Sequence, residues 1–138
     1  MATITMQTMR YINLLDRTSR VKTRKCFAYN NIVFFAVPRA MVSRAIGPDA
    51  TNVKRIQENI GKRIKIISEA RGVEDAKRFV EDVVNPVKFK SLEVRDNGII
   101  ITAGGTQNKA ALLGRNKRRL IELNQILKDT FGMELRVV

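Results

Sequence analysis

The chain has 138 residues, 44% of them hydrophobic, which allows one ordinary domain or two small ones with packed cores. Its 26 lysines and arginines exceed its 13 acidic residues, so the net charge is +13. The first 72 residues carry 14 basic and 4 acidic side chains, and the remainder carry 12 and 9. Solvated basic faces are one interpretation, but such an excess favours a polyanionic partner. Nucleic acid fits better than a membrane because the sequence has no long apolar run or basic amphipathic helix.

Residues with catalytic chemistry are scarce. The chain contains no histidine, which excludes His-based acid–base catalysis, Ser-His triads and His metal sites. It has no Walker loop and no Gly-x-Gly-x-x-Gly run. We therefore expect no enzyme activity, no cofactor and no metal.

Cysteine usage bears on the compartment. The single Cys26 cannot form a disulfide within the chain, which favours a reducing, cytoplasmic setting. Its neighbours are typical of a strand, so a small core residue is expected rather than a nucleophile. The sequence predicts neither a signal peptide nor a transmembrane segment.

In chain order, the first expected element is a helix that Thr3 or Thr5 can cap and that ends near residues 17–19. Its inner face is expected to hold Met6, Met9, Ile12 and Leu14 or Leu15. Two strands follow, over residues 26–29 and 32–37, and Asn30-Asn31 forms the turn between them. Helices are then expected over 40–46 and 50–59, on either side of Gly47, and a strand over 63–68. In the helix over 50–59, the spacing of Val53, Ile56 and Ile60 predicts one apolar face.

The second half repeats this order. Its expected elements are a helix over 73–84, strands over 92–95 and 99–103, helices over 108–113 and from about 117, and a strand over 134–138. Gly114 stands where Gly47 does, 67 residues later. The sequence thus predicts an α+β fold of two tandem α-β-β-α-α-β domains, residues 1–70 and 71–138, each with a three-stranded sheet covered by helices.

The glycine turn between two helices suits an oxyanion. The second helix begins with unpaired amides and a positive dipole end, and glycine lets a phosphate approach closely. In the second half, basic residues gather here: Arg115, Lys117, Arg118 and Arg119. The alternative interpretation is that these basic residues are simply solvated at the start of the helix. Cations at that end are repelled by the helix dipole, so a bound anion that offsets this repulsion is favoured.

The order of elements, with Ile46-Gly47 and Leu113-Gly114 between the middle helices, resembles a KH domain of the type II arrangement. In that family a Gly-x-x-Gly loop clamps the backbone of about four nucleotides. The pair resembles the tandem KH domains of the NusA family and, as a short chain, its archaeal members, over residues 4–138. The resemblance implies an apolar groove for the bases. Ile46 and Leu113 either lie on the floor of this groove or pack in the core, and Val53 and Leu120 are expected in the core.

Two departures from the family pattern concern the loops. The family has glycine at the fourth loop position, where this chain has Ala50 and Lys117. In the first loop Pro48 removes an amide donor, and Asp49 either repels a phosphate or caps the following helix. We therefore expect the second loop to be the better clamp.

RNA is nevertheless expected to touch both domains. In the first, it could cross Arg20, Lys22, Arg24, Lys54, Arg55, Lys62, Arg63 and Lys65. The predicted RNA-binding residues are Ile46, Gly47, Pro48, Asp49, Ala50, Lys54, Arg55, Lys62, Arg63, Lys65, Leu113, Gly114, Arg115, Asn116, Lys117, Arg118 and Arg119.

The resemblance implies a monomeric protein that binds single-stranded RNA and acts in transcription termination, antitermination or elongation control, with RNA polymerase or a transcription complex as a possible partner. The alternative is a protein-interaction scaffold of degenerate KH domains associated with RNA polymerase or the ribosome. The low aromatic content, 6%, argues against an RRM-like or OB-like stacking platform.

Overall fold

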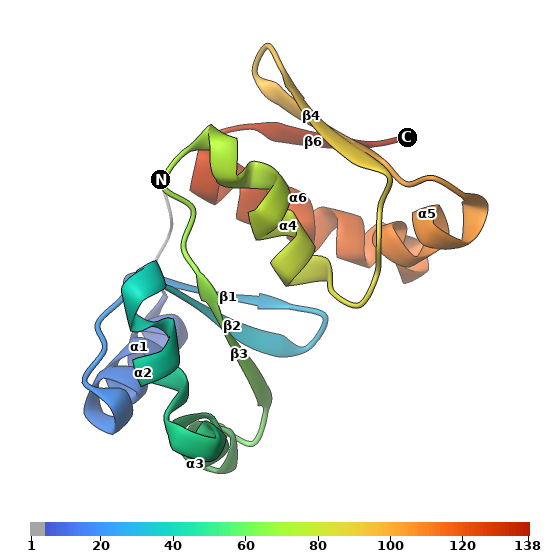
Figure 1. The fold of residues 1–138 in the computed structure, drawn as a ribbon. Helices are drawn as coiled ribbons and strands as arrows, with labels where there is room; N and C mark the ends of the chain where they lie inside the picture. The colour runs from blue at the N-terminus through green and yellow to red at the C-terminus, as the bar shows by residue number, and fades with distance from the viewer. Residues whose placement is uncertain (1–4) are drawn as a thin grey trace. The chain divides into compact units, whose positions relative to one another are not determined.

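The computed structural model describes residues 5–138, and the chain divides into two compact units with the boundary between Glu69 and Ala70. Each unit contains, in order, a helix, a β-hairpin, two helices joined by a glycine loop, and a final strand (Figure 1). This mixed α+β arrangement, with two three-stranded sheets, fits a KH-like fold with two tandem domains. The predicted fold class is confirmed.

The first unit is a sheet of strands with helices packed on it. Its elements are α1 (Met6–Ser19), β1 (Lys25–Tyr29), β2 (Ile32–Val37), η1 (Arg39–Met41), α2 (Val42–Ile46), η2 (Pro48–Ala50), α3 (Thr51–Ile60) and β3 (Arg63–Ser68). Strand β2 lies in the middle, antiparallel to β1 and parallel to β3. Asn30 and Asn31 both have positive φ, 54° and 61°, as the tight hairpin turn requires.

The core of the first unit is formed by one face of the sheet and the inner sides of its helices. Its buried residues are Tyr11, Leu15, Val21, Val33, Phe35, Val37, Ala45, Ile56 and Ile64. Val53 and Ile60 pack against them and are partly buried. The predicted apolar face of α3 is therefore confirmed.

The inner face of α1 agrees with the prediction at Leu15 and differs from it at Met6 and Met9. Tyr11 and Leu15 are buried, whereas Met6 is 91% and Met9 52% exposed. Successive residues turn by about 100° around a helix, so Met9 lies almost opposite Tyr11. Thr5 caps the helix reciprocally with Thr8, and Thr3 lies outside the described residues.

The second unit has the same order and the same sheet topology. Its elements are η3 (Val73–Asp75), α4 (Ala76–Val84), β4 (Ser91–Arg95), β5 (Gly98–Thr102), α5 (Thr106–Leu113), η4 (Arg115–Lys117), α6 (Arg118–Phe131) and β6 (Glu134–Val137). Strand β5 pairs antiparallel with β4 and parallel with β6. The large buried side chains of the second unit include Phe79, Ile99, Ile101, Leu112, Leu123 and Leu127.

Both sheets contain a parallel pair, which needs a long crossover between its strands. In the first unit α2, the glycine loop and α3 make this crossover, and in the second α5, the loop and α6 do so. The sheets thereby hold each pair of helices, and the loop between them, in place. Within residues 5–138, none of the helices combines the length and the apolar character that a bilayer span requires.

Candidate nucleic-acid interface

The two glycine loops, Gly47–Ala50 and Gly114–Lys117, have nearly the same backbone conformation. The glycines have φ/ψ of 80°/164° and 74°/175°. The third positions, Asp49 and Asn116, have 54°/31° and 55°/30°. The fourth positions, Ala50 and Lys117, have 59°/29° and 59°/23°. Each loop also has a hydrogen bond from the fourth-position amide to the glycine carbonyl, of 3.1 Å and 3.2 Å.

The fourth position is left-handed in both loops although neither has glycine there. A left-handed conformation costs an L-residue about 1–2 kcal/mol, whereas glycine adopts it without this strain. Ala50 and Lys117 adopt it nonetheless, so the two loops share one backbone path although their side chains differ.

The first loop position requires glycine for a steric reason. A Cβ atom at Gly47 would lie 2.8 Å from Asn52 Nδ2, and one at Gly114 would lie 2.4 Å from Arg119 Cγ. Asn52 and Arg119 occupy equivalent places in the repeat, in the first turn of α3 and α6. Asn52 also donates a hydrogen bond of 3.1 Å to the Arg44 carbonyl, which ties α3 to the end of α2.

Asp49 does not cap α3. The N-cap is Ala50, without a side-chain hydrogen bond, and it is the Thr51 hydroxyl that donates to the Pro48 carbonyl. Asp49 is in the left-handed region, which a short polar side chain tolerates, and it lies one residue before the N-cap of the helix. The carboxylate is exposed and forms no ion pair or hydrogen bond with residues 5–138. The first loop therefore presents negative charge.

The second loop presents positive charge at the start of a 14-residue helix. Arg115, Lys117 and Arg118 are exposed, and the first turn of α6 has no acidic residue. Arg119 differs from them, because its side chain is only 26% exposed, covers Gly114 and lies 3.3 Å from a Glu122 oxygen. Three cations and the positive end of the helix dipole thus act on one region of the surface, which suits a phosphate.

An apolar residue precedes each glycine. Ile46 and Leu113 are partly exposed, whereas the residues before them, Ala45 and Leu112, are fully buried. Both partly exposed side chains are thus available to an apolar ligand surface beside the loops.

The remaining predicted residues of the first unit do not all gather at its loop. Lys54 and Arg55 are exposed in the first half of α3. Lys62 and Arg63 follow its other end, and a ten-residue helix is about 15 Å long. Lys65 lies in β3, opposite Phe34 of β2. The sequence reasoning missed Arg44, an exposed cation one turn before Gly47, which its spacing of three residues could have indicated.

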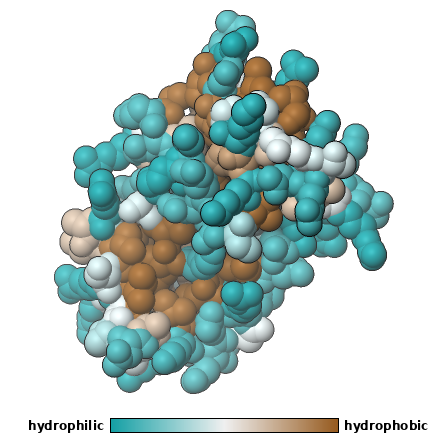
Figure 2. Space-filling view, turned by 45° about the vertical axis from the view of Figure 1, so that its right-hand side comes forward, coloured by the Kyte–Doolittle hydropathy of each residue, from teal (hydrophilic) through white to brown (hydrophobic). Residues whose placement is uncertain are grey.

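Other reactive groups are few. Burial raises the pKa of the Cys26 thiol to about 12, so the thiol is protonated at neutral pH and a poor nucleophile. Within the described residues, no group of three or more His, Cys, Asp or Glu side chains is placed to hold a metal ion. Hydrophilic side chains cover much of the face in Figure 2, with apolar side chains gathered in patches between them.

Comparison with known proteins gives matches of low sequence identity. No family model matches the chain. A "Probable transcription termination protein NusA" from Halococcus morrhuae is 26% identical over 95 residues, which cover 69% of this chain and 66% of the relative. A protein of the same name from Methanocaldococcus jannaschii is 25% identical over 128 residues, which cover 91% of this chain and 68% of the relative. The matches thus span about two thirds of each relative.

A solved structure extends the match to the whole fold. The crystal structure of APE1850 has a TM-score of 0.68 and 27% sequence identity, covering 98% of this chain and 99% of that one. Both halves of the tandem arrangement are included at that coverage. The comparisons confirm that the chain resembles the archaeal NusA-like proteins, as its sequence predicts.

Proposed function

We propose that the chain binds single-stranded RNA through its two KH-like units and acts in transcription termination, antitermination or elongation control. The observation that carries this proposal is the second loop, where Arg115, Lys117 and Arg118 surround a glycine turn at the start of α6. The net charge of +13 supports a polyanionic partner. The names of the two archaeal relatives support the link to transcription. The chain's lack of histidine supports a binding protein rather than an enzyme.

The binding test replaces exposed loop cations and keeps the backbone. Gly114 is unsuitable for substitution here because any side chain would collide with Arg119. In the double variant Arg115→Glu/Lys117→Glu, affinity for a pool of single-stranded RNA is expected to fall at least tenfold, because two phosphate contacts become repulsive. The charge-matched control, Lys77→Glu/Lys88→Glu, changes two exposed lysines outside the loops and is expected to keep its affinity. Equal losses in both variants would refute the loop as a clamp.

The transcription role needs a separate measurement. In a reconstituted archaeal transcription assay, the protein is expected to change the yield of terminated or paused transcripts, and the loop variant is expected to lose this effect. An effect that the loop variant retains would contradict a mechanism through the RNA.

The first loop supports a second candidate function, a protein-interaction scaffold associated with RNA polymerase or the ribosome. Pro48 lacks an amide hydrogen and the exposed Asp49 carboxylate repels phosphates, so this loop is a poor clamp. Capture of partners from a nuclease-treated extract separates the candidates. A polymerase or ribosomal partner that stays bound without RNA favours the scaffold, and its loss favours RNA binding.

A further inference from the structure

Apolar side chains are exposed on the side of α1 that faces away from the core. Met6 and Met9 extend into solvent, and Ile12 is partly exposed. Two hollows of about 550 and 600 Å³ lie along this side and share Met9, Asn13 and Asp16 as lining residues. Because they are contiguous, we call them the α1 groove, bounded by the outward face of α1 (residues 6–17) and by the connector of residues 22–24.

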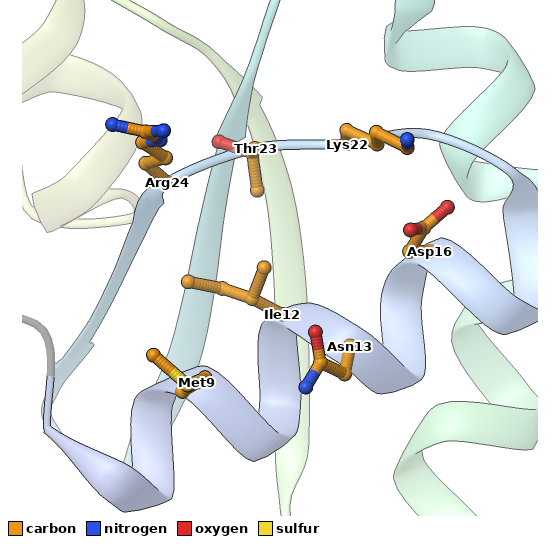
Figure 3. A pocket seen from close by; sticks show the side chains of 7 residues that line it. All are labelled: Met9, Ile12, Asn13, Asp16, Lys22, Thr23 and Arg24. Atoms are coloured by element: carbon orange, nitrogen blue, oxygen red, sulfur yellow. The ribbon is translucent and has the colours of Figure 1, made fainter.

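The wall of the α1 groove opposite the helix is held in place. Figure 3 shows Met9 and Ile12 on α1 facing the connector that carries Lys22, Thr23 and Arg24. The Thr23 hydroxyl donates a 2.5 Å hydrogen bond to the Ala36 carbonyl of β2 and accepts one of 3.1 Å from the Lys25 amide. The connector is therefore fixed to the sheet, and the groove exists before a ligand binds.

The rim of the α1 groove is positively charged. Arg10, Arg17, Lys22 and Arg24 line it, against one carboxylate, Asp16. None of these four cations forms an ion pair with residues 5–138. An apolar floor with unpaired cations on its rim is complementary to a ligand that has both apolar and acidic groups.

RNA is a poor match for this floor. Outside a KH-type groove, single-stranded bases are held mostly by stacking on aromatic rings, and no aromatic side chain lines the α1 groove. Exposed methionines, which are flexible and polarisable, instead suit the apolar side chains of a peptide.

The equivalent helix of the second unit lacks these features. The segment η3–α4 carries acidic residues, including Glu74, Asp75, Glu81 and Asp82, and its helix has nine residues against 14 in α1. Both units have the same fold, so the fold does not require a methionine-lined basic groove.

We propose that the α1 groove docks an acidic, amphipathic segment of a partner protein, with apolar side chains of that segment on Met6, Met9 and Ile12 and its carboxylates on the basic rim. All the residues involved lie on α1 and the connector that follows it, outside the two glycine loops, so the loop variant leaves this surface unchanged.

The methionines provide a direct test. The chain has five, so labelling their methyl groups with ¹³C gives a simple NMR spectrum of the whole protein. The probe is a synthetic helical peptide with leucines on one face and glutamates on the other. On titration, the signals of Met6 and Met9 are expected to shift, while those of Met41 and Met133 stay in place. No shift at Met6 and Met9 up to about 1 mM peptide would overturn the proposal.

Variants and competing ligands distinguish the docking surface from an RNA surface. Arg10→Glu/Lys22→Glu is expected to weaken peptide binding about tenfold, and Lys77→Glu/Lys88→Glu to leave it unchanged. The same peptide with lysines in place of glutamates is expected not to bind. Equal binding of that peptide, or a shift of Met6 and Met9 with oligouridine instead of the acidic peptide, would refute the assignment. The variant Arg115→Glu/Lys117→Glu is expected to lose RNA binding and to keep peptide binding. This outcome would separate the docking proposal from the RNA-binding proposal.

Discussion

Arg119 lies over Gly114 so closely that a Cβ atom on the glycine would be 2.4 Å from Arg119 Cγ and 2.9 Å from Arg119 Cβ. The glycine is thus required by its neighbour as well as by its φ of 74°. The same arginine is held by Glu122, which keeps its stem over the loop. The basic cluster that begins α6 therefore contains one residue that shapes the loop and three that are free to meet a ligand.

This contact predicts a difference between two glycine substitutions. Gly132→Ala should cost about 1–2 kcal/mol of unfolding free energy, because Gly132 has a φ of 68° and open space around it. Gly114→Ala should cost about 1–3 kcal/mol more, because the φ/ψ of 74°/175° at Gly114 is essentially restricted to glycine and because the methyl group also collides with Arg119. Urea unfolding of both variants measures the difference. Equal costs would contradict both the backbone restriction at Gly114 and its collision with Arg119.

The left-handed fourth position of the first loop predicts a stabilising substitution. Ala50→Gly removes the strain of a φ of 59° and should raise the unfolding free energy by about 0.5–1 kcal/mol, after the entropic cost of glycine. Ala110→Gly, in the exposed interior of α5, is the control and should lower it by about 1 kcal/mol. A lower unfolding free energy in Ala50→Gly would show that the backbone at Ala50 is not strained.

The salt dependence of RNA binding should report how many phosphates the loops contact. With about 4–8 phosphate contacts, the slope of log affinity against log salt is expected at about −3 to −6. Arg115→Glu/Lys117→Glu should reduce its magnitude by about 1.4, since each contact to a single strand contributes about 0.7. An unchanged slope in the variant would place the phosphates elsewhere.

The shared backbone of the two loops predicts that their side chains can be exchanged. The triple variant Pro48→Arg/Asp49→Asn/Ala50→Lys gives the first loop the side chains of the second. It should unfold within about 1 kcal/mol of the wild type, because the second loop already holds these residues at the same angles. RNA affinity should rise several-fold as two cations replace one carboxylate. Filter-binding and unfolding measurements check both parts, and an unchanged affinity would mean that RNA does not reach the first loop.

Cys26 predicts a dependence of stability on alkaline pH. Its pKa is raised from 9.0 to about 12 by burial, so the folded state holds the thiol proton more tightly than the unfolded state. This favourable contribution is fully present below pH 9 and is lost as pH rises from about 9 towards 12. The difference in unfolding free energy between the wild type and Cys26→Ala should therefore shift against the wild type over that range. A constant difference would mean that the thiolate is tolerated in β1.

Local patterns in the sequence are sufficient to predict the order of elements. Paired asparagines or Asp-Asn-Gly mark the hairpins, glycines end the helices, and apolar residues three or four apart identify the buried face of α3. Most predicted bounds lie within about two residues of the observed ones, including α5, which begins at Thr106 rather than near residue 108.

Tertiary packing decides what these patterns leave open. In α1, two apolar stripes compete, one through Met6 and Met9 and the other through Tyr11 and Leu15, and the sheet selects the second. Aspartate is a common N-cap residue, yet Asp49 lies in the left-handed part of the loop and Ala50 occupies the N-cap position of α3. The contacts of Asn52 and Arg119 with the glycines depend on side-chain direction, which spacing alone does not reveal.

The parallel pairing of the last strand in each unit has a consequence for the growing chain. A hairpin forms from neighbouring residues, but β3 and β6 can pair only after the whole crossover has been made. Each glycine loop lies in the middle of such a crossover, so its geometry is fixed by residues synthesised after it. A nascent chain thus completes the geometry of its first loop once Ser68 has left the ribosome, and that of its second only after Val137, so the two loops form one after the other.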